Sequence, residues 1–256
     1  MIVNLHTHTP RCRHAVGTER EYAEAAIAAK LQVLGFSDHT PFWFPGDYYS
    51  HMRMYPHELQ DYADTVRRLQ KEYAGRLEIP LGVEVEYYPA FFPELLPRLQ
   101  DAGIAYMLLG QHWCGNEIDE PYNGHPTGSE SALARYCDQV IEAMQTGLFT
   151  YVAHPDIFYY IGDRSIFKKH MQRICKEAKS CNIPLEINML GMNENRQYPH
   201  PVFWEAAAEE GCCVVIGSDA HKPAHVVHPE LEKKALAMIK ELSLELVERP
   251  QIRRIL

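Results

Sequence analysis

Short apolar segments alternate with helix-like segments along most of the chain, and this alternation limits the folds that it can adopt. Strands are expected at residues 2–9, 35–39, 77–86, 106–112, 149–154, 184–188 and 212–217. A segment with helical periodicity follows each of them. Regular β/α alternation is typical of a mostly parallel sheet with helices on its outside. About seven such units in 256 residues fit a closed α/β barrel better than an open sheet.

The helical segments have apolar residues three and four positions apart, and two of them have recognisable starts. Thr18 and Glu21 have the spacing of a capping box. Ser165 is expected to cap the helix that contains Phe167. Further helices are expected near 56–73, 93–102, 129–146, 200–210 and from Leu231 onward. No composition shift divides the chain, so we expect one domain over residues 1–256.

Histidine and carboxylate residues stand at the C-terminal ends of almost all these strands. In a barrel these ends converge on one face, where active sites are built. Buried polar and charged groups at such positions would be costly unless they coordinate metal. Seven histidines with Glu84 and Asp219 exceed the three or four protein ligands of one catalytic zinc, so we expect several metals. The residues concerned are His6, His8, Asp38, His39, Glu84, His112, His154, Glu186, Asn188, Asp219 and His221, with His14 on the first loop.

The overall composition excludes some classes of protein and favours others. The formal net charge of −9 argues against a broad nucleic-acid surface, which would be basic. Seven cysteines, an odd number without a C-x-x-C pair, favour a reduced, cytoplasmic compartment. The N-terminus lacks the pattern of a signal peptide, and no apolar run approaches the roughly 18 residues that span a bilayer. We therefore expect no nucleic-acid partner and no membrane partner, and the sequence leaves the oligomeric state open.

Taken together, these residues resemble the PHP (polymerase and histidinol phosphatase) superfamily, and within it the monofunctional histidinol-phosphate phosphatases. The resemblance implies a distorted, TIM-like (β/α)7 barrel. It also implies hydrolysis of L-histidinol phosphate to L-histidinol and phosphate in histidine biosynthesis. The matching segments run in the family's order from the second residue to about position 225: His6-Thr7-His8-Thr9, Ser37-Asp38-His39, Gly82-Val83-Glu84-Val85-Glu86, Gln111-His112, Ala153-His154-Pro155-Asp156, Glu186-Ile187-Asn188 and Gly217-Ser218-Asp219-Ala220-His221.

The resemblance further implies three divalent metal ions, which in the family are zinc, manganese or iron. His6, His8, Glu84 and Asp219 would hold the first metal. Glu84 would bridge to a second metal completed by His112 and His154, and His14, His39 and His221 would hold the third. A hydroxide bridging two metals would attack phosphorus in line, which makes Glu84 and Asp219 candidate catalytic residues. Asp38, beside His39, is a candidate general acid for the leaving group.

Substrate contacts are expected from residues in loops over the site. Arg164 and Arg196 look similar to family arginines that contact phosphate, and bidentate arginine suits phosphate geometry. Arg53 is a further candidate, in the long aromatic loop over residues 40–56. Phe42, Trp43 and Tyr48 of that loop could stack on the substrate imidazole or could form core or lid. Five polar residues could orient metal-binding histidines: Asp38, Glu86, Asp156, Glu186 and Asn188. His225 and His228 could contact substrate.

Three alternative functions stay open at this point. A PHP phosphoesterase could act on nucleotides or nucleic-acid ends, although the acidic composition weighs against it. A non-catalytic metal module that supports a polymerase normally has degraded ligand positions, and here every expected position is filled. A hydrolase of the amidohydrolase type normally has a lysine at a strand end, and in this sequence no lysine stands at the end of a predicted strand.

Overall fold

The computed structural model describes residues 1–255, and short parallel strands surrounded by helices form its framework. The strands are β1 (Val3–Asn4), β2 (Val33–Leu34), β3 (Gly82–Val85), β4 (Tyr106–Leu109), β5 (Phe149–Val152), β6 (Leu185–Asn188), β7 (Cys213–Gly217) and β8 (Glu245–Leu246). The helices are α1 (Glu19–Ala28), α2 (Leu59–Glu72), α3 (Phe92–Asp101), α4 (Glu130–Gln145), α5 (Arg164–Ser180), α6 (Met189–Asn193), α7 (Pro201–Glu209) and α8 (Pro229–Glu241). Three 3-10 turns, η1 (Pro10–Cys12), η2 (Pro56–Glu58) and η3 (Pro223–His225), complete the elements.

The strands form a ring that is closed partly by single bridges, which is why the barrel is distorted. β1 pairs with β2, and β3 to β8 form a parallel sheet in sequence order. The bridges Phe36 to Leu81 and His39 to Glu84 connect the chain after β2 to β3. A bridge from Thr7 to Ala220 connects the chain after β1 to the end of β7. The expected seven-unit α/β barrel is therefore present, and β8 adds to the outer edge of β7.

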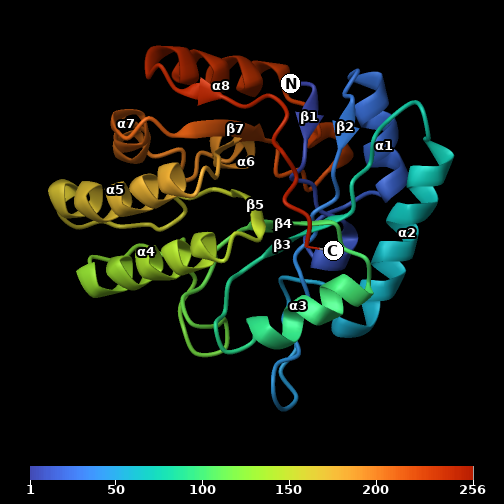
Figure 1. The fold of residues 1–256 in the computed structure, drawn as a ribbon, viewed down its shortest axis with the longest axis horizontal. Helices are drawn as coiled ribbons and strands as arrows, with labels where there is room; N and C mark the ends of the chain where they lie inside the picture. Colours follow the sequence, from blue (N-terminus) through green and yellow to red (C-terminus); the bar gives the residue numbers. More distant parts are fainter. Residues whose placement is uncertain (256) are drawn as a thin grey trace.

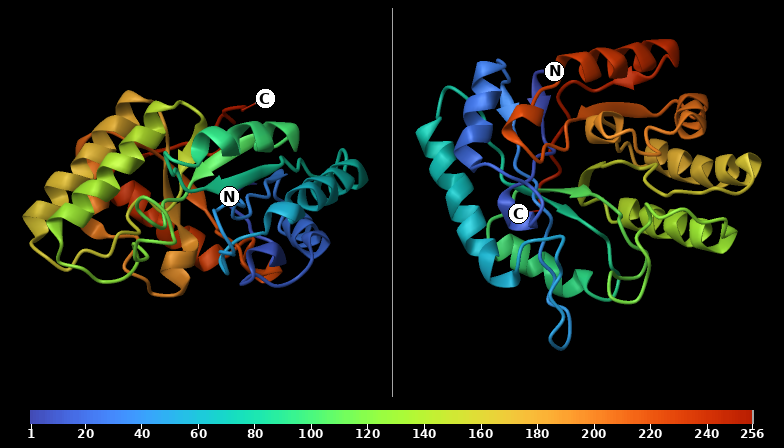
Figure 2. Two further views of the ribbon diagram at one scale, coloured as in Figure 1. Left: turned by 90° about the horizontal axis from the view of Figure 1, so that it is seen from below. Right: turned by 180° about the vertical axis from the view of Figure 1, so that it is seen from behind.

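The helices surround the strands, and their starts follow from local sequence. In Figure 1, α1, α2, α3, α4, α5, α7 and α8 follow one another around the outside in chain order. Figure 2 shows α4 and α5 side by side on one flank. Thr18 caps α1 with the predicted capping box. The prediction that Ser165 caps α5 was wrong. Asp163 is the cap, because its carboxylate accepts hydrogen bonds from the backbone N–H groups of Ser165 and Ile166.

Apolar side chains fill the N-terminal half of the barrel, and the histidines and carboxylates lie at the other end. Tyr106 crosses this interior, and its hydroxyl donates to the Leu5 carbonyl at 2.8 Å. Glycine at positions 35 and 82 leaves room for Tyr106, because a Cβ at either position would collide with its side chain. Ile252 packs under this cluster, which consists of Val3, Leu5, Val33, Tyr106, Leu108, Tyr151, Ala153 and Val215. Within residues 1–255, no helix is both long enough and apolar enough to cross a membrane.

Candidate metal centre

Four side chains meet at the C-terminal mouth of the barrel with the spacing of a metal cage. His6 Nε2 lies 3.6 Å from Glu84 Oε2 and 3.5 Å from Asp219 Oδ1. His8 Nε2 lies 3.5 Å and 3.0 Å from the same two oxygens. Tetrahedral ligands at zinc distances of about 2.0–2.1 Å are about 3.3 Å apart. The four atoms therefore have the separation that one small divalent ion requires.

The same atoms are buried without hydrogen-bond partners. His6 Nε2, both ring nitrogens of His8, Glu84 Oε2 and Asp219 Oδ1 have no partner within residues 1–255. The side chains of His6 and His8 are fully buried. Buried polar atoms are nearly always paired, because an unpaired one loses its hydration without compensation. This concentration of unpaired ligand atoms fits bound metal ions.

Two further groups of ligands continue the cage on either side. Glu84 Oε1 lies 2.8 Å from His154 Nε2 and 3.9 Å from His112 Nε2. One ligand atom from each of His14, His39 and His221 lies within 4.8 Å of the others. His39 Nδ1 also lies 3.0 Å from Glu84 Oε2, so His39 could serve either group. The structure thus brings together all nine residues that the sequence proposed as metal ligands.

Two of these residues adopt backbone conformations that are unusual for side chains with a Cβ. His154 has φ of 30° and Asp219 has φ of 49°, and each stands two residues after the end of a strand. Positive φ is uncommon outside glycine, and it is retained where the surrounding structure demands it. At these two positions it directs the side chain into the barrel mouth.

Two glycines make room for buried carboxylates in the same layer. A Cβ on Gly110 would lie 2.5 Å from Cδ of Glu84, and a Cβ on Gly217 would lie 2.5 Å from Cδ of Glu186. Real Cβ atoms essentially never approach so closely. Both carboxylates therefore depend on a neighbouring strand residue that has no side chain.

A layer of polar groups behind the ligands sets their orientation. Glu186 accepts from His6 Nδ1 at 2.8 Å and from the His154 backbone N–H at 3.0 Å. Glu86 lies 2.9 Å from His112 Nδ1, and Asn188 donates to Asp219 at 3.1 Å. Partners of this kind fix the tautomer and ring direction of metal-binding histidines. The contacts of Glu86 and Glu186 agree with the proposal that they orient histidine ligands, whereas Asn188 donates to Asp219 and Glu186 and contacts no histidine ring.

Asp38 is placed for its proposed orienting role but not for that of a general acid, and the hydrogen bonds of Asp156 go to His200 and Trp204 and not to a ligand side chain. Asp38 is fully buried behind His8, where it accepts from the His39 backbone N–H at 2.8 Å and from Thr9. It lies 3.4 Å from His8 Nδ1, a position suited to orienting this ring rather than to protonating a leaving group in the cavity. Asp156 accepts from the His200 backbone N–H and from the Trp204 indole, so it anchors α7.

Burial and neighbouring charges shift the pKa values of the cage ligands in both directions. Burial opposes ionisation of Glu84, but His39, His6 and His112 hold the pKa of its carboxyl well below the ordinary value. Burial lowers the pKa of His39 to about 3, so this ring is neutral. At His8, burial is outweighed by Asp219 and Asp38, which raise the pKa to about 9. Metal binding at His8 therefore has to displace a proton.

A cavity of about 660 Å³ opens over the ligands and has the size of a small-molecule site. Sequence reasoning found Arg196 and His225 in its lining but missed several polar residues there. These side chains come from loops, where spacing in sequence carries no periodic signal. The residues missed are Tyr122, Glu194, Tyr198 and Lys222.

Only one of the three proposed phosphate-binding arginines lies at this cavity. Arg196 lines it, pairs with Glu194 and donates to the Tyr198 hydroxyl at 3.0 Å. The placement expected for Arg164 was wrong, because it begins α5, is 71% exposed and pairs with Glu205. The placement expected for Arg53 was also wrong: its side chain is 2% exposed and is enclosed by Glu86 and Glu117.

The aromatic loop and the cysteine near the ligands have packing roles. Phe42, Trp43 and Tyr48 line a separate hollow with Arg53, not the cavity above the ligands.

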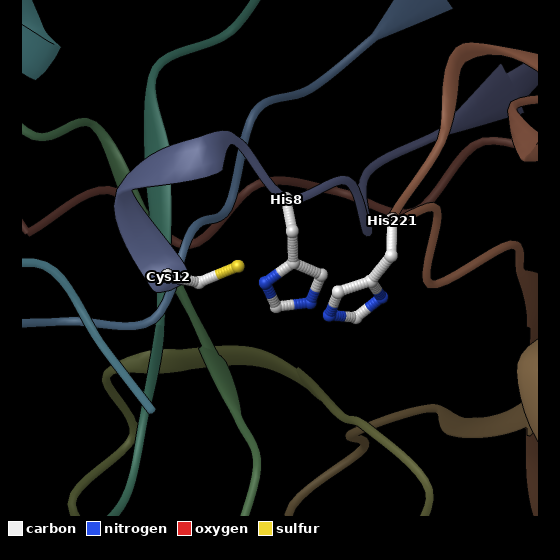
Figure 3. Close-up of side chains that lie close together, drawn as sticks. All are labelled: His8, Cys12 and His221. Carbon is white, nitrogen blue, oxygen red and sulfur yellow. The ribbon is translucent and has the colours of Figure 1, made fainter. Parts of the chain in front are cut away.

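Figure 3 shows the Cys12 sulfur turned toward the ring of His8, with His221 on the other side of this ring. Cys12 is fully buried, and burial raises the pKa of its thiol. Cys12 is therefore a small buried thiol beside the ligands.

Comparison with known proteins identifies the family of this chain. Residues 4–189 match the model of the PHP domain family, so the chain belongs to the PHP family. It is 33% identical over 238 residues to the probable histidinol-phosphatase of Deinococcus radiodurans, with 88% of each chain covered. It is 25% identical over 278 residues to the probable histidinol-phosphatase of Schizosaccharomyces pombe, with 97% of this chain and 90% of that relative covered. Both of these relatives are named as probable histidinol-phosphatases.

Two solved structures share the fold at low sequence identity. One is the histidinol phosphate phosphatase of Lactococcus lactis complexed with zinc, L-histidinol and phosphate, with a TM-score of 0.75 and 19% identity over 97% of this chain and 96% of that one. The other is the putative histidinol phosphatase of Listeria monocytogenes, with a TM-score of 0.74 and 19% identity over 90% of this chain and 99% of that one. At 19% identity, the similarity to these two structures supports the barrel fold of this chain and nothing beyond the fold.

Proposed function

We propose that this protein is a metal-dependent phosphomonoesterase that hydrolyses L-histidinol phosphate to L-histidinol and phosphate, a step of histidine biosynthesis. The observation that carries the proposal is the cage of unpaired, buried ligand atoms at the mouth of the barrel. A full-length relationship to histidinol-phosphatases supports the choice of substrate. The cavity above the cage has room for a small phosphomonoester.

The metal content follows from the three ligand groups. We propose three divalent ions, zinc, manganese or iron, since histidine and carboxylate ligands suit all three metals. His6, His8, Glu84 and Asp219 would hold one, and Glu84 would share a second with His112 and His154. His14, His39 and His221 would hold the third. Such ions supply Lewis acidity toward phosphate oxygens and a water nucleophile at neutral pH.

The remaining steps belong to side chains of the chain itself. Arg196 is the guanidinium at the cavity, and we propose that it binds the substrate phosphate, exchanging its contact with Glu194 for one with phosphate. The Tyr198 hydroxyl, which accepts from Arg196 at 3.0 Å, holds the guanidinium in place. Glu186 and Glu86 keep the histidine rings in one orientation while substrate binds and product leaves. The cytoplasmic location and the single domain over residues 1–256 stay predictions.

The test is phosphate release from a panel that contains histidinol phosphate, simple alkyl phosphates and nucleotides. The metal-loaded protein should prefer histidinol phosphate, and His6→Asn should abolish turnover. His125→Asn changes an exposed histidine outside the cage and serves as the matched control. Preference for a nucleotide would refute the assigned substrate and leave the phosphomonoesterase chemistry intact. Activity that survives complete metal removal would refute the metal-dependent mechanism.

A further inference from the structure

We propose that Arg53, a buried residue outside the substrate cavity, is a positioning residue that holds the ligand His112 in its metal-binding orientation through Glu86. The inference rests on the proposed metal site and is independent of which phosphate ester the enzyme cleaves. Arg53 belongs to the aromatic loop before α2, which projects beyond α3 in Figure 1.

Arg53 is a buried cation whose donors are used by specific partners. Its terminal nitrogen Nη1 donates to Glu86 Oε2 at 2.7 Å and to the Thr40 carbonyl at 3.0 Å. Its Nε donates to Glu117 Oε2 at 2.9 Å, and its other terminal nitrogen also contacts Glu117. The ring of Phe42 lies 5.3 Å from the guanidinium carbon. A planar guanidinium suits this fork of acceptors, and the single ammonium of lysine could not reach all of them.

Glu86 connects this cation to the metal ligand. It is fully buried, and its two carboxylate oxygens have different partners. Oε2 faces Arg53, and Oε1 lies 2.9 Å from His112 Nδ1. Without Arg53, Glu86 would be a buried carboxylate whose second oxygen lacks its cation. It would then rotate away from its present position and would stop fixing the Nδ1–H tautomer of His112.

The consequence should be confined to one of the proposed metal positions. His112 presents Nε2 toward Glu84 Oε1, at 3.9 Å, in the group that also contains His154. His6, His8 and Asp219 have other orienting partners, namely Glu186, Asp38 and Asn188. Loss of a partner behind a ligand typically costs about 10–100-fold in metal affinity. A general loss of stability would instead weaken all metals together, so the selectivity separates positioning from a structural role.

The experiment measures metal affinity and stoichiometry, not turnover. Metal-free protein is titrated with zinc against a competing chelator for the wild type, Arg53→Met, Arg53→Lys, Glu86→Gln and the Arg53→Met/Glu86→Gln pair. Glu117→Gln is the matched control, because it removes the other acidic partner of the same guanidinium and leaves the contact with Glu86. Circular dichroism reports the fold of each variant.

We expect Arg53→Met to weaken one zinc position by about 10–100-fold and Glu117→Gln to leave it within about twofold. The double variant should bind no more weakly than Glu86→Gln alone, because both changes break one chain of contacts. Wild-type zinc affinity in a folded Arg53→Met protein would overturn the inference, as would additive losses in the double variant. If Arg53→Met does not fold, Arg53→Lys decides: the loss at one position should persist, and full rescue by lysine would show that charge alone is needed.

Discussion

Replacing Gly110 by alanine should disable the metal centre without changing any ligand. The new Cβ would lie 2.5 Å from Cδ and 2.7 Å from Cγ of Glu84, whereas ordinary contacts begin at 3.4 Å. The carboxylate would have to move by about 1 Å, and metal–ligand distances tolerate only about 0.2 Å. Glu84 is shared by two of the proposed metals. We therefore expect a loss of metal affinity of about 100-fold or more, above the usual effect of losing an orienting partner.

The assay compares Gly110→Ala with Gly128→Ala, using zinc titration against a chelator and phosphate release at saturating metal. Gly128 is the matched control, because its added Cβ would meet nothing within 4 Å among the described residues. Over-packing costs about 1–3 kcal/mol of unfolding free energy, so Gly110→Ala should remain folded in a barrel of this size. Native zinc affinity and activity in Gly110→Ala would refute the reasoning, because Glu84 would then be free to give way without cost to the site.

Three further predictions follow from the site and its surroundings. Metal removal by a chelator should lower the melting temperature, since ions at about 1,000 times their Kd stabilise the folded state by about 4 kcal/mol; an unchanged calorimetric transition would contradict this. Arg196→Ala should raise KM for the phosphate ester about tenfold or more by removing a charged hydrogen bond, while Arg164→Ala, at an exposed surface pair, should change it less than twofold in steady-state kinetics. Burial raises the pKa of Asp156 to about 7, above about 3.9 in the unfolded chain. The folded state therefore holds this proton more tightly, and the contribution of Asp156 to the free energy of unfolding should fall as pH rises from about 4 to about 7. Asp156→Asn should flatten that part of the curve in denaturant titrations, and an unchanged slope would show that Asp156 is ionised throughout.

Sequence patterns were accurate wherever a local rule decides the structure. Thr18 and Glu21 form the capping box that their spacing predicts. At α5, however, Asp163 accepts from the backbone N–H groups of Ser165 and Ile166 and starts the helix two residues before the predicted cap, and spacing alone could not rank the two candidate caps. β1 is shorter than the strand predicted at residues 2–9, and β2 at Val33–Leu34 ends just before the strand predicted at 35–39, because only residues 3–4 and 33–34 form a continuous ladder. Their polar ends continue the barrel through single bridges.

The arginines show where local reasoning fails. Arg53, Arg164 and Arg196 all stand in or next to loops that follow strands, and on the sequence alone Arg164 and Arg196 were the main candidates for phosphate contact, with Arg53 a further one. Only Arg196 lies at the cavity. Arg164 turns outward to Glu205, and Arg53 turns inward to Glu86 and Glu117. Each outcome depends on a carboxylate that is distant in sequence, and long flexible side chains choose among partners only after the fold has brought them near.

The sequence by itself determined the α/β barrel class and the set of histidines and carboxylates at its open end, because strand and helix periodicity places alternate residues on defined faces. Only the tertiary structure decided which ligands share a cage, which partners orient them and which charged loop residues face the cavity. Those outcomes depend on contacts between β1 and β7, between loops and between strand ends far apart in the chain. A residue's own neighbours in sequence carry no information about such contacts.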